Sequence, residues 1–372
     1  MSNELEIKTE RLVQMLSAEN LGGVLLNSQH NFAWLTGGKS NVINASTETG
    51  VCFLFVRADG KRFVLVNNIE MPRILAEEVS AQDFEPIEFS WQAEKASGNL
   101  IFEKAKSLCT SNGEIVTDLL LNPNIRSVEN LISRCRYSLT DGEIERYRQL
   151  GKDSAVALGK VFGEINAGES EIEIARKTKN ELAQFNIDSV VTIVGADERI
   201  ANFRHPIPTE NVWKKLLLIS VCGKRGGLIA SLSRIACIGE IPAELKRRTA
   251  ANADVFAEAL AATQIGATGA EIYAMIDKAY AENGFAGEIN KHHQGGAIGY
   301  KTRDWVAHPN SAEIVVENQA FAWNPTVTGT KIEETAILTA NGFEIVTTSA
   351  DFPQISANVN GQNIALPNIL EL

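Results

Sequence analysis

The sequence predicts two domains, a smaller α/β domain over residues 1–138 and a larger α+β domain over residues 139–372. The 372 residues exceed the length of one typical domain. Helix and strand patterns alternate in the first part, whereas the second part twice shows long helices followed by antiparallel strands. We expect those strands to form a curved sheet whose helices cover one face.

Four segments define the first domain. Residues 9–20 carry apolar side chains at helical spacing, and residues 22–27 form a short apolar run typical of a buried strand. Residues 51–68 predict two strands joined by an Asp-Gly hairpin turn. Residues 70–79 are again expected to be helical.

The second domain begins with a well-marked helix. Thr140 and Glu143 have the spacing of a capping box, in which each side chain satisfies a backbone N–H of the other residue. The boundary is therefore expected just before this helix. Its predicted inward stripe consists of Ile144, Tyr147, Leu150, Ala155 and Leu158.

The second domain contains a faint internal repeat. The segments that begin near Asn166 and Gln264 each have a glycine followed, five and six residues later, by Glu-Ile. A duplicated helix–helix–strand unit would explain this echo. The strand-like runs that follow the two copies are residues 189–195, 215–223 and 228–239, then 320–325, 331–339 and 341–348.

Composition narrows the classes of function. A net charge of −11 without a basic cluster disfavours nucleic-acid binding. The polar start lacks the apolar core of a signal peptide, and no run approaches the 18 or more apolar residues of a membrane span. The five cysteines are scattered, which is typical of reduced, buried thiols. We expect a cytoplasmic protein that binds neither nucleic acid nor membrane.

The neighbouring His292 and His293 are the most obvious metal-ligand candidates. On an extended segment their side chains would point to opposite faces, so one ion is not expected to bind both. The strands at 215–223 and 228–239 offer serines, which are poor ligands. These residues therefore provide too few good ligands for a metal cluster, and no cofactor is expected.

Five motifs along residues 140–350, "SLTDGEIERYR", "SLSR", "GGAIG", "WNP" and "KIEET", occur in a familiar order. This part resembles the pita-bread (M24) peptidase family, which includes creatinase, prolidase, aminopeptidase P and methionine aminopeptidase. The first domain resembles the creatinase/prolidase N-terminal domain. The resemblance implies a pita-bread fold for residues 139–372 and a homodimer.

The family's metal peptidases use two Asp eleven residues apart, a His, a Glu before Pro and a second Glu. The matching positions hold Ser220, Ser231, Gly296 and Asn324, and only Glu333 retains a ligand. The same resemblance that predicts the fold therefore argues against a two-metal centre.

His205, in "NFRHPIPTEN", matches the family's substrate-contacting His followed by Pro. In creatinase, which works without metal, the matching His is the acid/base, a role that suits imidazole. The resemblance implies that Glu333 faces the pocket, where it could orient His205 or act as an acid if burial raises its pKa. The alternative is a loop histidine that hydrogen-bonds a turn.

Three arginines are candidates for binding a substrate anion, because guanidinium groups hold carboxylates bidentately. They are Arg303, Arg204 and Arg199. The alternative is an ion pair at the surface, for example with Asp304 or Glu198.

Four further residues are expected to contact substrate. His293 is preferred to His292 because it is nearer Gly296, and the glycines beside it would let the backbone approach a ligand. The other three are Asn324, Ser220 and Ser231. Arg234 is expected to form a structural salt bridge.

The function predicted is a metal-independent, creatinase-like hydrolase of a C–N bond in a small carboxylated substrate, with β-elimination as a variant. Two alternatives stay open. One is a non-catalytic pseudo-peptidase that binds a peptide, metabolite or protein. The other is an Xaa-Pro-type metallopeptidase. The ligand would be an anionic small molecule or short peptide.

Overall fold

A computed structural model describes residues 2–110, 112–120, 125–349, 352–359 and 361–372. Contacts within the chain divide it into two units, residues 1–136 and 137–372, and each unit is described by itself. None of the described helices has both the length and the apolar character that crossing a membrane would require.

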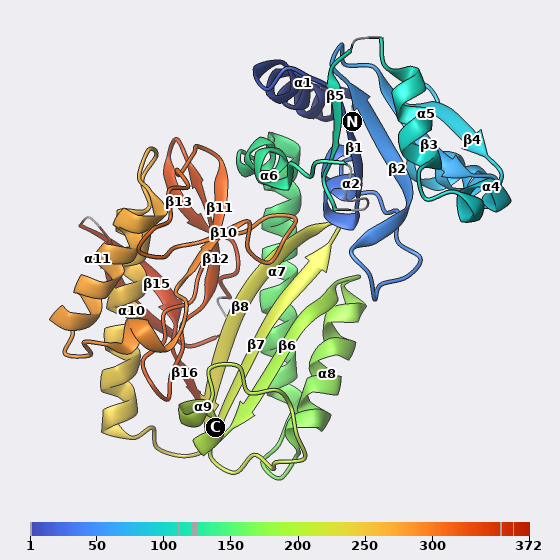
Figure 1. The fold of residues 1–372 in the computed structure, drawn as a ribbon. Helices are drawn as coiled ribbons and strands as arrows, with labels where there is room; N and C mark the ends of the chain where they lie inside the picture. Colours follow the sequence, from blue (N-terminus) through green and yellow to red (C-terminus); the bar gives the residue numbers. More distant parts are fainter. Residues whose placement is uncertain (1, 111, 121–124, 350–351, 360) are drawn as a thin grey trace. The chain divides into compact units, whose positions relative to one another are not determined.

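The first unit is built on one mixed five-stranded sheet in the order β4-β3-β2-β1-β5 (Figure 1). The predicted hairpin is confirmed as the antiparallel pair β2–β3. The strands are β1 (Leu21–Ser28), β2 (Thr49–Arg57), β3 (Arg62–Asn67), β4 (Glu85–Phe89) and β5 (Glu114–Thr117). The helices are α1 (Ser2–Ala18), α2 (Gln29–Leu35), α3 (Met71–Arg73), the π-helix η1 (Ile74–Glu78), α4 (Trp91–Ala96), α5 (Leu100–Leu108) and α6 (Glu129–Tyr137).

A buried polar network in this unit centres on Glu129. Its carboxylate accepts hydrogen bonds from His30 at 3.0 Å, Asn31 at 2.8 Å and Arg136 at 3.0 Å. Burial alone raises the pKa of Glu129, but the His30 hydrogen bond and the Arg136 charge outweigh it and lower the pKa to about 2.

The second unit is α+β, as predicted. Its sheets have the strand orders β16-β8-β7-β6, β10-β9-β11-β12-β13 and β14-β15. The strands are β6 (Asp188–Ala196), β7 (Leu216–Arg225), β8 (Leu228–Cys237), β9 (Gly295–Ala297), β10 (Trp305–Val306), β11 (Gln319–Trp323), β12 (Glu334–Thr339), β13 (Gly342–Ile345), β14 (Gln354–Val359), β15 (Gln362–Pro367) and β16 (Ile369–Glu371). The helices are α7 (Asp141–Glu164), α8 (Glu171–Gln184), α9 (Glu198–Asn202), α10 (Ala243–Ala262), α11 (Gly269–Glu282) and the 3-10 helix η2 (Glu288–Lys291).

The two halves of this unit are built alike, in agreement with the internal echo. The predicted capping box at Thr140 begins α7. Matching boxes at Ser170 and Thr268 begin α8 and α11, and each of these two residues also forms an isolated antiparallel β-bridge. Helix α7 packs beside α8, and α10 beside α11 (Figure 1).

The expected curved sheet is divided into two sheets that meet along β8. The backbone N–H of Ser233 donates to the carbonyl of Glu333 at 3.1 Å, and that of Ile229 to the carbonyl of Gly299 at 2.9 Å. Within the first sheet, Ser220 lies opposite Ser233. This junction brings serines of β7 and β8 against the segment that enters β12.

All five cysteines are free. Cys52 and Cys237 are buried, while Cys109, Cys135 and Cys222 are partly buried.

Candidate functional site

A buried carboxylate lies where the two sheets meet. We call Glu333, Lys331, Arg303, Ser220 and Ser233 the Glu333 cluster. Oε2 of Glu333 accepts from the Lys331 ammonium at 2.7 Å and from the hydroxyls of Ser220 at 2.9 Å and Ser233 at 2.7 Å. Oε1 lies 3.4 Å from the Arg303 guanidinium. Each carboxylate oxygen is therefore paired with a cation of the chain itself.

Glu333 is not in the protonated state that an acid catalyst needs. Burial alone raises its pKa, but the positive charges of Lys331 and Arg303 and the hydrogen bonds hold it far below its usual range. Glu333 is thus ionised and cannot donate a proton as an acid. It makes no hydrogen bond to His205 among the described residues, so the expected orienting role falls to another group.

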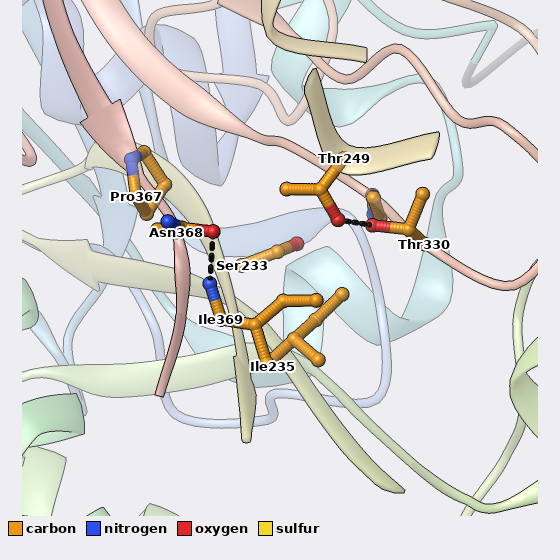
Figure 2. A pocket seen from close by; sticks show the side chains of 8 residues that line it. Ser233, Ile235, Thr249, Thr330, Pro367, Asn368 and Ile369 are labelled. Carbon is orange, nitrogen blue, oxygen red and sulfur yellow. Dashed lines mark hydrogen bonds between the residues drawn. The ribbon is translucent and has the colours of Figure 1, made fainter. Parts of the chain in front are cut away.

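The segment that carries Lys331 is held in place by contacts of its neighbour Thr330. Figure 2 shows a small hollow in which the side chains of Thr249 and Thr330 point toward each other, with their hydroxyls 3.3 Å apart. Lys331 and Ser233 also line this hollow. The Lys331 ammonium further donates to the Ser220 hydroxyl at 3.1 Å, which ties it to the sheet.

Three histidines form a second group, which we call the histidine cluster: His205, His292 and His293. Nε2 of His205 and Nε2 of His292 lie 3.1 Å apart. The His292 and His293 ring centroids are 4.4 Å apart and tilted by 33°. The expectation that these neighbours point to opposite faces is wrong, since their rings lie together in the segment that follows η2.

Hydrogen bonds from α11 and the loop after β11 position His292. Tyr280 donates to Gln294 at 2.6 Å, and Gln294 donates to the His292 carbonyl at 2.5 Å. The Thr326 hydroxyl donates to a backbone carbonyl and lies 3.4 Å from Nδ1 of His292, so it accepts the Nδ1 proton. His292 then accepts at Nε2, His205 donates from its own Nε2, and Nδ1 of His205 carries a free lone pair.

Burial and nearby positive charges lower the pKa values of the three histidines and keep their rings neutral. Burial is the main cause, followed by the Lys331 charge for His205 and His292 and by the Arg303 charge for His293. The pKa of His205 is lowered, that of His292 falls to about 2 and that of His293 to about 4. The charges of the Glu333 cluster therefore act on these rings.

The glycines after His293 allow close packing of neighbouring strands and do not make room for a ligand. A Cβ atom at Gly296 would lie 2.2 Å from the carbonyl oxygen of Trp305, and one at Gly295 would lie 2.1 Å from that of Ala322. We expected a bound molecule to approach these glycines. The backbone of the neighbouring strands occupies that space instead.

Asn324 and Arg303 each keep an unused polar atom. Oδ1 of Asn324 and Nε of Arg303 are buried without a hydrogen-bond partner in the described part of the chain. Such atoms are costly to leave unpaired, so they are candidates for contact with a bound molecule.

Two of the predicted arginines have structural partners. Arg199 donates to the buried Glu171 at 2.9 Å and to the carbonyl of Ile207 at 2.8 Å. Arg204 donates to Glu288 at 3.0 Å and to Thr328 at 2.7 Å. Both guanidinium groups therefore hold the loop that carries His205.

The remaining predicted residues also have partners. Ser231 pairs with Cys222 at 3.1 Å and does not bond Glu333. Arg234 forms a buried ion pair with Glu334 and donates to the carbonyl of Thr347 at 2.7 Å, which is the structural role expected for it.

Sequence reasoning overlooked Lys331 and ranked His292 below His293. Lys331 stands two residues before Glu333, and residues at that spacing on an extended segment share a face. That spacing could have indicated that Lys331 lies beside Glu333. The contact between His292 and His205 joins loops 87 residues apart and has no local pattern.

The fold and site define a two-unit protein of the pita-bread class, with a small N-terminal α/β unit and a duplicated α+β unit that carries a buried glutamate and three clustered histidines. Residues 145–340 match the metallopeptidase family M24, and residues 8–138 match the creatinase/prolidase N-terminal domain. The first match covers more than half of the chain, so the chain belongs to family M24.

Several relatives share its fold. The prolidase from Pyrococcus horikoshii OT3 has a TM-score of 0.74 and 18% identity, over 92% of this chain and 98% of that one. The dipeptidase PepE from Mycobacterium ulcerans has a TM-score of 0.78 and 15% identity, over 100% and 99%. An uncharacterized peptidase from Staphylococcus haemolyticus (strain JCSC1435) is 22% identical over 91% of this chain and 98% of its own length.

The residues present do not fit the two-metal centre that the resemblance associates with the family's peptidases. Ser220, Ser231 and Asn324 are neutral at three ligand positions, and the backbone leaves no room for a side chain at Gly296. Hard cations need several charged oxygen donors. At the remaining ligand, Glu333, the Lys331 ammonium already occupies Oε2.

Proposed function

We propose that the protein is a hydrolase that cleaves a C–N bond, of amide or amidine type, in a small carboxylated substrate without a two-metal centre. The observation that carries this proposal is the pairing of both Glu333 oxygens with Lys331 at 2.7 Å and Arg303 at 3.4 Å. These two cations supply positive charge where divalent ions would otherwise do so, and together with Glu333 they leave one net positive charge.

His205 is the proposed acid/base. Its ring is the exposed member of the contact with His292, and that contact leaves Nδ1 free to accept a proton. His205 would take a proton from water as the water oxygen attacks the carbon, and would return it to the leaving nitrogen. The C–N bond breaks, a C–O bond forms, and no other reactant is consumed.

The unused polar atoms suggest how the substrate is held. The buried N–H of Arg303 is suited to a carboxylate oxygen, and the Oδ1 of Asn324 to an N–H of the substrate. The remaining positive charge of the Glu333 cluster would also favour an anionic substrate and stabilise negative charge that develops on the attacked group.

The test is a turnover screen of small amides, amidines and dipeptides that carry a carboxylate, with and without a strong chelator. We expect turnover that survives the chelator and falls about 10²–10⁴-fold in His205→Ala. A parallel thermal-shift screen reports binding, because a ligand that binds the folded state raises the apparent stability. Ligands that bind without turnover in either protein would overturn the proposal in favour of a binding module.

A further inference from the structure

We propose that His205, His292 and His293 form a binding site for one divalent transition-metal ion that prefers imidazole, of the Zn²⁺ type. One candidate ligand nitrogen from each ring lies within 4.8 Å of the other two. This site shares no residue with the five ligand positions of the family's two-metal centre.

The geometry is close to that of a three-histidine centre. Two nitrogens bound to one tetrahedral zinc at about 2.0–2.1 Å lie about 3.3 Å apart. The Nε2 atoms of His205 and His292 lie 3.1 Å apart. The His293 ring is 5.9 Å from that of His205 between centroids, so a small rotation of this exposed side chain completes the set.

One ligand is already oriented as a metal ligand requires. The Thr326 hydroxyl holds Nδ1 of His292 and leaves Nε2 with its lone pair directed at His205. Metal-bound histidines commonly use such a partner on the second nitrogen, which fixes the tautomer and the ring orientation. His205 and His293 are exposed, so a fourth coordination position would face solvent.

The donor set also predicts which ions bind. Three imidazoles without a carboxylate favour Zn²⁺, Cu²⁺, Ni²⁺ or Co²⁺ over Mg²⁺, Ca²⁺ or Mn²⁺. An ion bound to Nε2 of His205 would shift the proton of that ring to Nδ1, which could then no longer accept a proton. Zinc would then inhibit turnover, a consequence that rests on the proposed function, whereas the binding itself does not.

The test is zinc titration of untagged protein, by calorimetry and equilibrium dialysis after treatment with a chelator. We expect one equivalent per chain, and Co²⁺ should give the visible absorption of a four-coordinate site. His292→Asn and His293→Asn should each weaken binding by about tenfold or more. His308→Asn, outside the cluster, should bind as the unaltered chain does.

A double variant, His292→Asn with His293→Asn, decides the outcome. Thermal denaturation first shows that it folds. If it binds zinc as tightly as the unaltered chain, or if the unaltered chain binds no zinc, the proposed site is wrong. Because these titrations contain no substrate, a failure of turnover would overturn the proposed function and leave the zinc result standing.

Discussion

The Glu333 cluster and the histidine cluster differ in how their polar atoms are used. Every carboxylate oxygen of Glu333 is bound by a cation or hydroxyl of the chain. His205 bonds only His292 among the described residues of its cluster, and that contact leaves its Nδ1 without a partner. The difference indicates that the first cluster is a fixed electrostatic support, while the second is free to exchange protons or bind ligands.

The strongest test of this contrast is Lys331→Met. Removing Lys331 breaks the shortest ion pair of the buried Glu333 carboxylate and leaves it only the 3.4 Å contact with Arg303, so we expect the free energy of unfolding to fall by about 3–5 kcal/mol. Urea denaturation measures it. Adding Glu333→Gln removes the carboxylate that has lost its closest cation and should recover most of the loss. A double variant no more stable than Lys331→Met would show that the pair is not the source.

A partly buried carboxylate in the other unit extends the comparison. Glu129 is also held by cationic and amide partners, and its pKa is lowered to about 2. Because the pKa is lowered in the folded state, the ionised Glu129 stabilises the fold at pH values above the ordinary pKa of glutamate. This stability is lost as the pH falls toward 2. The contribution is about 3 kcal/mol at neutral pH. Carboxyl NMR titration should place the midpoint near 2, and a midpoint near 4.5 would contradict this account.

Arg303→Gln measures the influence of one cluster on the other. The Arg303 charge acts on the histidine rings and disfavours a cation there. Removing it should tighten zinc binding about fivefold, the size expected for one like charge in a water-like dielectric. Calorimetry at low ionic strength checks this. Unchanged affinity would mean that the two clusters are electrostatically independent.

The smallest expected effect on stability is that of His205→Ala. His205 is exposed and loses only its contact with His292, so the free energy of unfolding should change by less than about 1 kcal/mol. Urea denaturation in parallel with Lys331→Met makes the comparison direct. A loss as large as that of Lys331→Met would give His205 a structural role.

The fold followed from local patterns and from the family resemblance. Thr140 and Glu143 specify their capping box within four residues, and the Asp-Gly turn specifies its hairpin. One side-chain role was also accessible, since Arg234 forms the structural salt bridge that was expected of it, with Glu334.

The details of the site depend on contacts between distant segments, which no local pattern encodes. The alternation rule failed for His292 and His293, whose rings lie together between a 3-10 helix and Gly295, which has a positive φ of 103°. The glycines were assigned to a ligand although strand backbones fill the space beside them. Lys331 opens the motif "KIEET", but only its contact with Glu333 in the folded chain shows that it pairs with that carboxylate.

The central claim is that the chain's own cations replace the two-metal centre at Glu333. Crystals soaked in Mn²⁺ test it directly, because Mn²⁺ prefers carboxylate and other oxygen ligands and avoids an all-imidazole site. Anomalous difference maps should show no manganese beside Glu333, with the Lys331 ammonium still on Oε2. A pair of manganese peaks between Glu333, Asn324 and Ser220, with Lys331 displaced, would contradict the account.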